Sequence, residues 1–159
     1  MKKSLVAISA VILVIAFISI LAVKSNSTGP IKLNINDKFT LLKSMSCGCC
    51  SVYETYMQKN GIQPEVPEIS DEQLTAMKDK YGIPSNLRSC HTTIVGNYFV
   101  EGHIPLEAVQ KMLYEKPDIK GITMPGMPSG SPGMPGSKEG PFIIYAVNQD
   151  GSATEFMRI

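Results

Sequence analysis

Three of the four cysteines in the chain lie within four consecutive positions, in the stretch Cys47-Gly48-Cys49-Cys50. This stretch contains both a CxxC and a CxC spacing, and Gly48 lets the backbone bend sharply between the sulfurs. Thiolates are nucleophiles and also metal ligands, and Cu(I) prefers thiolate and thioether donors. The spacing therefore predicts a soft-metal site or a redox-active thiol pair. Structural zinc requires four ligands in a tetrahedron, so we expect zinc less than copper.

Disulfide bonds are the alternative use of these thiols. An even number of cysteines outside the cytoplasm fits two bridges. A bridge between the neighbours Cys49 and Cys50 would be strained, so the pairs would be Cys47 with Cys50 and Cys49 with Cys90. A chain of this kind would be a structural module that two disulfides hold together.

The scaffold that must position these sulfurs is predicted to be a thioredoxin-like α/β domain at residues 38–159. The predicted order is β-α-β-α-β-β-α with an added C-terminal β-hairpin, and the CxxC lies at the first strand-to-helix junction. The first crossover should be parallel and right-handed. The cluster then lies at a helix N-terminus, where free N–H groups and the helix dipole favour thiolate. Strands are predicted at 38–43, 65–69, 92–95, 98–101, 142–147 and 153–157, and helices at 50–59, 70–81 and 106–114.

The fourth cysteine stands directly before the third predicted strand, in Ser89-Cys90-His91-Thr92. In a thioredoxin-like layout this turn faces the CxxC and normally offers a cis proline, which Cys90 and His91 replace here. We expect His91 to be a direct ligand, to orient one, or to be an ordinary hydrogen-bonded histidine. His103, the second of the two histidines, ranks below His91, since it can instead brace the turn before Pro105.

Residues 121–141 are rich in Met, Pro and Gly, in the stretch GITMPGMPSGSPGMPG and just beyond it. Pro and Gly at this density exclude a helix and a central strand. Composition alone indicates a linker to the last hairpin. Two other readings stay open: the loop packs over the cysteine cluster, or Met124, Met127 and Met134 offer thioether ligands to Cu(I).

The N-terminal segment, residues 1–24, is predicted to be a signal anchor. Residues 4–23 carry no charge, and a helix of that length reaches about 30 Å, the thickness of a bilayer core. A cleaved signal peptide is the alternative, but its apolar core is usually only about 7–15 residues long. Lys2 and Lys3 in the cytoplasm would place the domain outside it. Residues 25–37 are polar and read as a linker.

Composition and missing motifs exclude several functions. A net charge of +1 with 18% charged residues gives no nucleic-acid footprint. The chain contains no GxGxxG, Walker or HExxH motif. Both histidines have better roles than membership of a Ser-His-Asp triad.

Five segments then follow one another along the chain: CGCC at 47–50, GIP at 82–84, LRSCHT at 87–92, VEGHIP at 100–105 and MPGMPSGSPGM at 124–134. Together they resemble the CopG-type periplasmic copper-resistance proteins, long catalogued as a domain of unknown function, over residues 38–157. The resemblance implies a thioredoxin-like fold and copper bound by Cys47, Cys49, Cys50 and Cys90. Many members carry a Trp and a His in the helix after the cluster, where this chain has Tyr53 and Met57.

Together, these patterns predict a membrane-anchored, extracytoplasmic protein, periplasmic or at the cell surface, that binds Cu(I), in one or several ions, for copper resistance. It would sequester, relay or redox-buffer copper, with a copper exporter or copper chaperone as its partner. The alternative is a thiol-disulfide oxidoreductase that uses Cys47 and Cys50.

Overall fold

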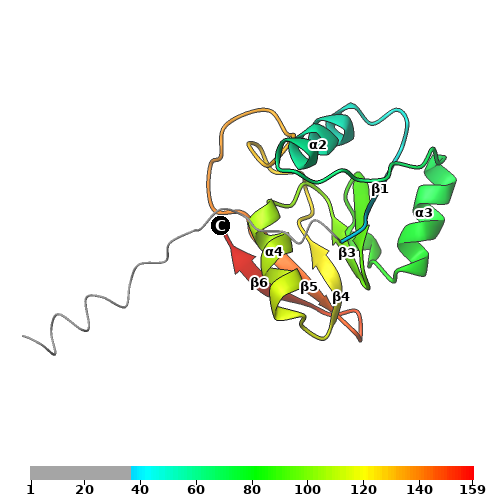
Figure 1. Ribbon diagram of the computed structural model, residues 1–159. Helices are drawn as coiled ribbons and strands as arrows, with labels where there is room; N and C mark the ends of the chain where they lie inside the picture. The colour runs from blue at the N-terminus through cyan, green and yellow to red at the C-terminus, as the bar shows by residue number, and fades with distance from the viewer. Residues whose placement is uncertain (1–36) are drawn as a thin grey trace, which may run out of the picture. The chain divides into compact units, whose positions relative to one another are not determined.

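A six-stranded mixed sheet in the order β1-β2-β3-β4-β5-β6 forms the centre of the part of the chain that the computed structural model describes, residues 37–159 (Figure 1). Only β3 and β4 pair in parallel; the other neighbours are antiparallel. The strands are β1 (Phe39–Lys43), β2 (His91–Val95), β3 (Tyr98–Glu101), β4 (Ile119–Thr123), β5 (Ile143–Asn148) and β6 (Ala153–Arg158).

Three α-helices and one 3-10 turn accompany the sheet within the described residues. They are α2 (Gly48–Lys59), α3 (Asp71–Lys80), η1 (Ser85–Leu87) and α4 (Leu106–Glu115). A capping box begins α3, because the Ser70 side chain accepts from the Gln73 N–H and the Gln73 side chain accepts from the Ser70 N–H. The mixed α/β fold with a C-terminal hairpin, β5 and β6, is also as predicted.

The helices cover the two faces of the sheet unequally (Figure 1). Tyr53 and Met57 of α2 and Val109 and Met112 of α4 are buried in the main core, together with residues from β1, β3, β4 and β5. A smaller cluster on Phe99 covers the other face, near the end of α3 and η1. The first helix is thus fixed by its apolar side chains on the sheet, and its N-terminus lies at the end of β1.

The predicted strand at 65–69 is reduced to two isolated bridges. Glu65 pairs with Thr40 and Ile69 pairs with Ser44, both in parallel with β1 or its end. Pro67 lies between them and has no N–H to donate to a ladder. The expected parallel crossover after the first helix is therefore present, but the strand it leads to is not continuous.

The prediction that residues 121–141 are all loop is wrong at its beginning. Gly121 and the two residues after it belong to β4, a central strand between β3 and β5. A Cβ at Gly121 would lie 2.2 Å from the Phe99 carbonyl oxygen and 2.6 Å from its ring. Glycine stands here because β3 approaches too closely for a side chain, and not because the chain turns.

The predicted anchor at residues 1–24 lies outside the described residues, as does the predicted linker apart from Asp37. No helix in residues 37–159 has the length and apolar character needed to cross a membrane.

Candidate metal centre

The cysteine cluster lies at the N-terminus of α2, where Cys47 is the N-cap residue and Gly48 begins the helix. Cys50, Tyr53 and Met57 are its buried residues, and this spacing puts all three on the face that packs on the sheet. Cys47 and Cys49 are therefore left half-buried at the surface. In the structure Cys47 and Cys50 form a disulfide bond.

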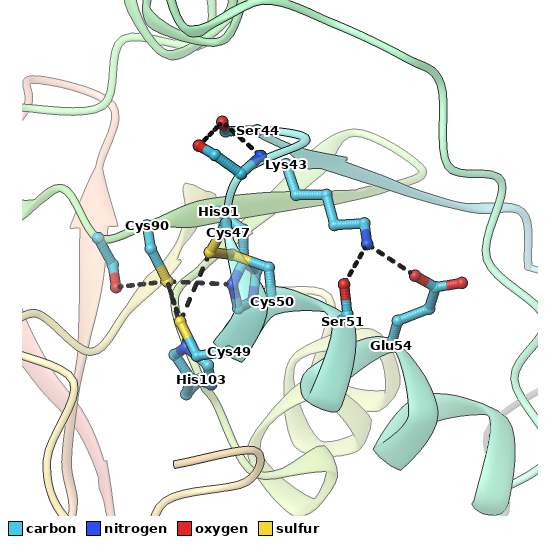
Figure 2. The surroundings of a disulfide bond; sticks show 12 residues. Lys43, Ser44, Cys47, Cys49, Cys50, Ser51, Glu54, Cys90, His91 and His103 are labelled. Carbon is cyan, nitrogen blue, oxygen red and sulfur yellow. Dashed lines mark hydrogen bonds and ion pairs between the residues drawn. A yellow bond between two sulfur atoms is a disulfide. The ribbon is translucent and has the colours of Figure 1, made fainter.

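Cys90 lies opposite this helix end, directly before β2, as the sequence predicts (Figure 2). Its Sγ is 3.9 Å from Cys49 Sγ, which in turn is 3.5 Å from Cys47 Sγ. Cys49 and Cys90 carry free thiols. Of the two disulfides that the alternative reading predicted, only the Cys47–Cys50 bond is therefore formed. The four cysteines offer ligand atoms that all lie within 4.8 Å of one another.

Both histidines lie against Cys90. His103 Nε2 is 3.1 Å and His91 Nδ1 is 3.4 Å from Cys90 Sγ, and the two rings meet edge to face at 4.7 Å. Cys90, His91 and His103 thus form a second group of metal-ligating atoms that shares Cys90 with the first. From the sequence, His103 ranks below His91 as a ligand, whereas the nitrogen of His103 is the closer of the two to Cys90 Sγ.

The protonation of His103 is fixed by a carbonyl from a distant loop. Its Nδ1 lies 2.7 Å from the Pro132 carbonyl oxygen, which can only accept, so Nδ1 carries the proton. Nε2 then presents its lone pair to Cys90. Burial lowers the pKa of His103 against the opposing effect of this carbonyl, which keeps the ring neutral and able to bind a metal.

His91 is buried completely, and its Nε2 has no hydrogen-bond partner among the described residues. Burial, aided by the nearby His103 and Lys78, lowers the pKa of His91 to about 3. The imidazole is therefore neutral at physiological pH. An unpaired, neutral nitrogen is unusual in a protein interior, because a buried polar atom without a partner is costly.

Cys90 is a protonated thiol at neutral pH in the metal-free protein. Burial, and then the neighbouring Cys49, raise the pKa of Cys90 to about 11. Its S–H can donate to the unprotonated Nε2 of His103, while its sulfur accepts from His91 Nδ1. A bound cation would displace the Cys90 proton, since metals bind the thiolate form.

Tyr53 packs the two histidines from the α2 side. Its ring lies 4.6 Å from the His91 ring and 5.5 Å from the His103 ring, measured between centroids. Its hydroxyl donates to the Ile104 carbonyl oxygen at 2.8 Å. This role of Tyr53 was not predicted from the sequence, where Tyr53 is noted only as a departure from the Trp and His that many family members carry in this helix.

The Met-rich loop reaches the site through its backbone at Pro132 and Gly133. The structure places Met124 in the main core, Met127 at the surface with 38% exposure, and Met134 half-buried. The loop is held by turns of its own, including a Met134 N–H that donates to the Ser131 carbonyl. It has a specific conformation against His103, and its role as a thioether donor stays a prediction.

At Gly133 the loop lies so close to Tyr53 and His103 that a side chain would not fit. A Cβ there would lie 2.8 Å from Tyr53 N and 3.3 Å from His103 Nδ1. We expect Gly133→Ala to lower the free energy of unfolding by about 1–3 kcal/mol more than Gly126→Ala, as overpacking does. Gly126 is the matched control, since its φ of +84° is close to the +82° of Gly133 but its Cβ would meet open space. Equal losses in urea unfolding would contradict the contact.

Comparison with known proteins finds a family model that covers part of this site. A family model described as "Protein of unknown function, DUF411" matches residues 87–134, which include Cys90, both histidines and most of the loop. No curated protein matches the chain.

Two solved structures match the described fold. They are titled "Copper resistance protein copG- Form 2" and "Copper resistance protein copG- Form 1", each with 31% identity, a TM-score of 0.67 and 77% of this chain covered. The alignment covers 98% and 96% of those chains. Since this identity extends over nearly the whole length of both solved chains, the chain belongs to the CopG family of copper-resistance proteins, the family catalogued as DUF411.

Proposed function

We propose that the chain binds copper, as Cu(I), through the sulfurs of Cys47, Cys49, Cys50 and Cys90, in the service of copper resistance. The observation that carries this proposal is the convergence of four cysteine ligand atoms within 4.8 Å of one another. Soft thiolates select Cu(I) over hard cations. The names of the matching structures support copper as the metal.

His91 and His103 complete the site in this proposal. Both rings are neutral because burial lowers their pKa values, and each places one nitrogen within 3.4 Å of Cys90 Sγ. The unpartnered Nε2 of His91 is the feature that ordinary packing does not explain. Donation from His103 Nδ1 to Pro132 orients the second ring, as outer hydrogen bonds orient metal-binding histidines.

The Cys47–Cys50 disulfide makes copper binding depend on redox state. Two electrons and two protons, supplied by a thiol reductant, convert the disulfide into two thiols. Only then can all four sulfurs act as ligands, and their protons leave as the metal binds. Oxidation of Cys47 and Cys50 to the disulfide would release copper. Such release is compatible with each of the three roles, sequestration, relay and redox buffering.

The fold supports a thioredoxin-like assignment for residues 38–159. A segment in parallel with β1 lies on one side of it, and β2 and then β3 follow antiparallel on the other. The strands β4, β5 and β6 extend this arrangement beyond β3. The cysteine cluster stands after β1 at the start of a helix, where the redox pair of such a domain is expected.

We propose that residues 4–23 anchor the domain to a membrane with the metal site outside the cytoplasm, either in the periplasm or at the cell surface. The uncharged stretch and the preceding Lys2 and Lys3 support this orientation. A copper exporter or copper chaperone would then be the partner that delivers or receives the metal.

The test is metal retention by the full chain in mild detergent, without oxygen, with copper and zinc both supplied. Reduced protein should titrate as four thiols, one for each cysteine, and retain copper after desalting. Protein with the disulfide intact should titrate as two thiols, Cys49 and Cys90, and retain much less. A reduced protein that keeps no copper, or that prefers zinc, would reject the proposal.

A thiol-disulfide oxidoreductase is the second candidate, and the disulfide at the N-terminus of α2 favours it. Under this alternative Cys49 and Cys90 would be dispensable. Disulfide-reductase activity that survives Cys49→Ser and Cys90→Ser, together with no copper retention, would move the chain to that class.

A further inference from the structure

A buried ion pair lies behind the segment that carries Cys90. Lys78 of α3 and Glu101 of β3 are joined through Nζ and Oε1, and their side chains are 6% and 0% exposed. Burying two charges carries a large desolvation penalty, and an apolar pair of similar volume often stabilises a fold equally well. A contribution to the stability of the fold is therefore a weak explanation for an ion pair at this position.

The pair binds the backbone on one side of Cys90 and a side chain on the other. The Ser89 N–H donates to Glu101 Oε1 at 2.5 Å, and Lys78 Nζ donates to the Ser89 carbonyl oxygen at 3.0 Å. Thr92 Oγ1 donates to Glu101 Oε2 at 2.6 Å. Both backbone groups of Ser89 are thus held by charged partners, which make stronger hydrogen bonds than neutral ones.

This stretch has no strand ladder to hold it, since β2 begins only at His91. Other contacts of this stretch include a hydrogen bond from Thr123 Oγ1 of β4 to the Leu87 carbonyl oxygen at 2.6 Å, one from Arg88 Nε to the Ile83 carbonyl oxygen at 3.0 Å, and the Arg88–Asp79 ion pair. Gly102 also lies against it. A Cβ at Gly102 would lie 2.8 Å from Ser89 Oγ. The turn therefore packs tightly against the end of β3, and the ion pair binds the backbone of Ser89, the residue directly before Cys90.

We propose that Lys78 and Glu101 are positioning residues of the thiol centre: the pair fixes the Ser89 backbone so that Cys90 Sγ faces Cys49 Sγ across 3.9 Å. This inference rests on the proposed function, in which Cys90 is a copper ligand, and adds the residues that hold Cys90 in place. An apolar pair could fill the same volume, but it could not bind the N–H and the carbonyl of Ser89.

The experiment measures positioning without metal. The full chain in mild detergent carries Cys47→Ser and Cys50→Ser, so that only Cys49 and Cys90 remain of the four cysteines. With a chelator present, diamide oxidises the two thiols to a disulfide; they lose two electrons and two protons, and the diazene becomes a hydrazine. The rate of this step is divided by the rate at which a monofunctional maleimide alkylates the same thiols, which corrects for intrinsic reactivity.

Lys78→Met with Glu101→Leu should reduce this normalised rate by about tenfold or more, because small misplacements of reacting groups have effects of that size. Urea unfolding of the double variant is measured beside that of the parent, because Ser89 and Thr92 lose hydrogen-bond partners, and the two rates are compared where both proteins are folded. Asp79→Asn is the matched control, since Asp79 pairs with Arg88 beside the same turn but its side chain is 64% exposed. That variant should crosslink at the parent rate.

A folded double variant that crosslinks at the parent rate would overturn the positioning role. If the double variant does not fold, Lys78→Met alone decides, because it removes the Nζ that donates to the Ser89 carbonyl oxygen and leaves Glu101 and Thr92 in place. Slower crosslinking in Lys78→Met supports the inference, and an unchanged rate overturns it. Failure of the wild-type chain to retain copper would instead reject the proposed function and leave this result in place.

Discussion

Replacing Cys90 with serine is expected to remove most of the copper affinity of the reduced chain. Cys90 is the one residue that belongs to both groups of ligand atoms, the four cysteines and the set with His91 and His103. Its loss would leave the three sulfurs at the helix end without the sulfur of the segment directly before β2. It would also remove the sulfur that both imidazoles face.

The expected loss of copper affinity in Cys90→Ser can be estimated from mutations that disturb a metal site less than the loss of a ligand does. Mutation of residues that only orient a ligand typically reduces metal affinity by 10–100-fold, so loss of a shared ligand should exceed about 100-fold. Competition between the chain and a Cu(I) chelator of known affinity measures it directly. The protein must be reduced, since the Cys47–Cys50 disulfide of the structure removes two of the sulfurs.

Met127→Ala is a suitable control for this measurement. Met127 is a soft donor on the loop that reaches His103 through Pro132, but its side chain is 38% exposed. If the variant keeps the wild-type affinity, the thioether is not a ligand, and the copper lost in Cys90→Ser is due to the thiol. Retention of wild-type affinity by Cys90→Ser would place copper elsewhere in the chain.

The sequence was sufficient for the part of the site that depends on local order. A CxxC between a strand and a helix, and a Cys-His pair before a later strand, already place four sulfurs at one end of the sheet. Apart from the predicted strand at 65–69 and the unpredicted β4, the strand and helix boundaries differ from the predicted ones by at most two residues. Local signals such as Gly61 after α2, with its φ of +84°, explain this agreement.

The failures come from contacts between distant segments. The density of Pro and Gly over 121–141 predicts a loop from Gly121 onward, and only the proximity of Phe99 in β3 shows why a strand requires glycine there. The acceptor for His103 is the carbonyl of Pro132, a backbone atom whose position no side-chain pattern encodes. Lys78 gave no signal either, since a lysine on an otherwise polar helix is expected in solvent, whereas it is 5% exposed.

The metal-free chain should lose stability as the pH falls below about 6.5, because its histidines are neutral in the folded state. An unfolded histidine takes up a proton near pH 6.5, whereas burial keeps the pKa of His91 at about 3. Between these two values only the unfolded state binds the proton. The free energy of unfolding should therefore fall by about 1.4 kcal/mol per pH unit for each such histidine. His103, whose pKa is also lowered by burial, adds to the slope in the upper part of this window.

The variant His91→Gln isolates the contribution of His91, the larger of the two histidine contributions to the pH dependence of the free energy of unfolding. A glutamine does not titrate, so the variant should lose stability less steeply by about 1.4 kcal/mol per pH unit. Urea unfolding of both chains with a chelator, at pH 7.5, 6.0 and 5.0, gives the two slopes, and carboxylates common to both cancel in the difference. His103→Gln, measured in parallel, should reduce the slope by less. Parallel curves for the wild type and His91→Gln would mean that folded His91 takes up a proton as readily as it does in the unfolded chain, and would contradict the lowered pKa of His91.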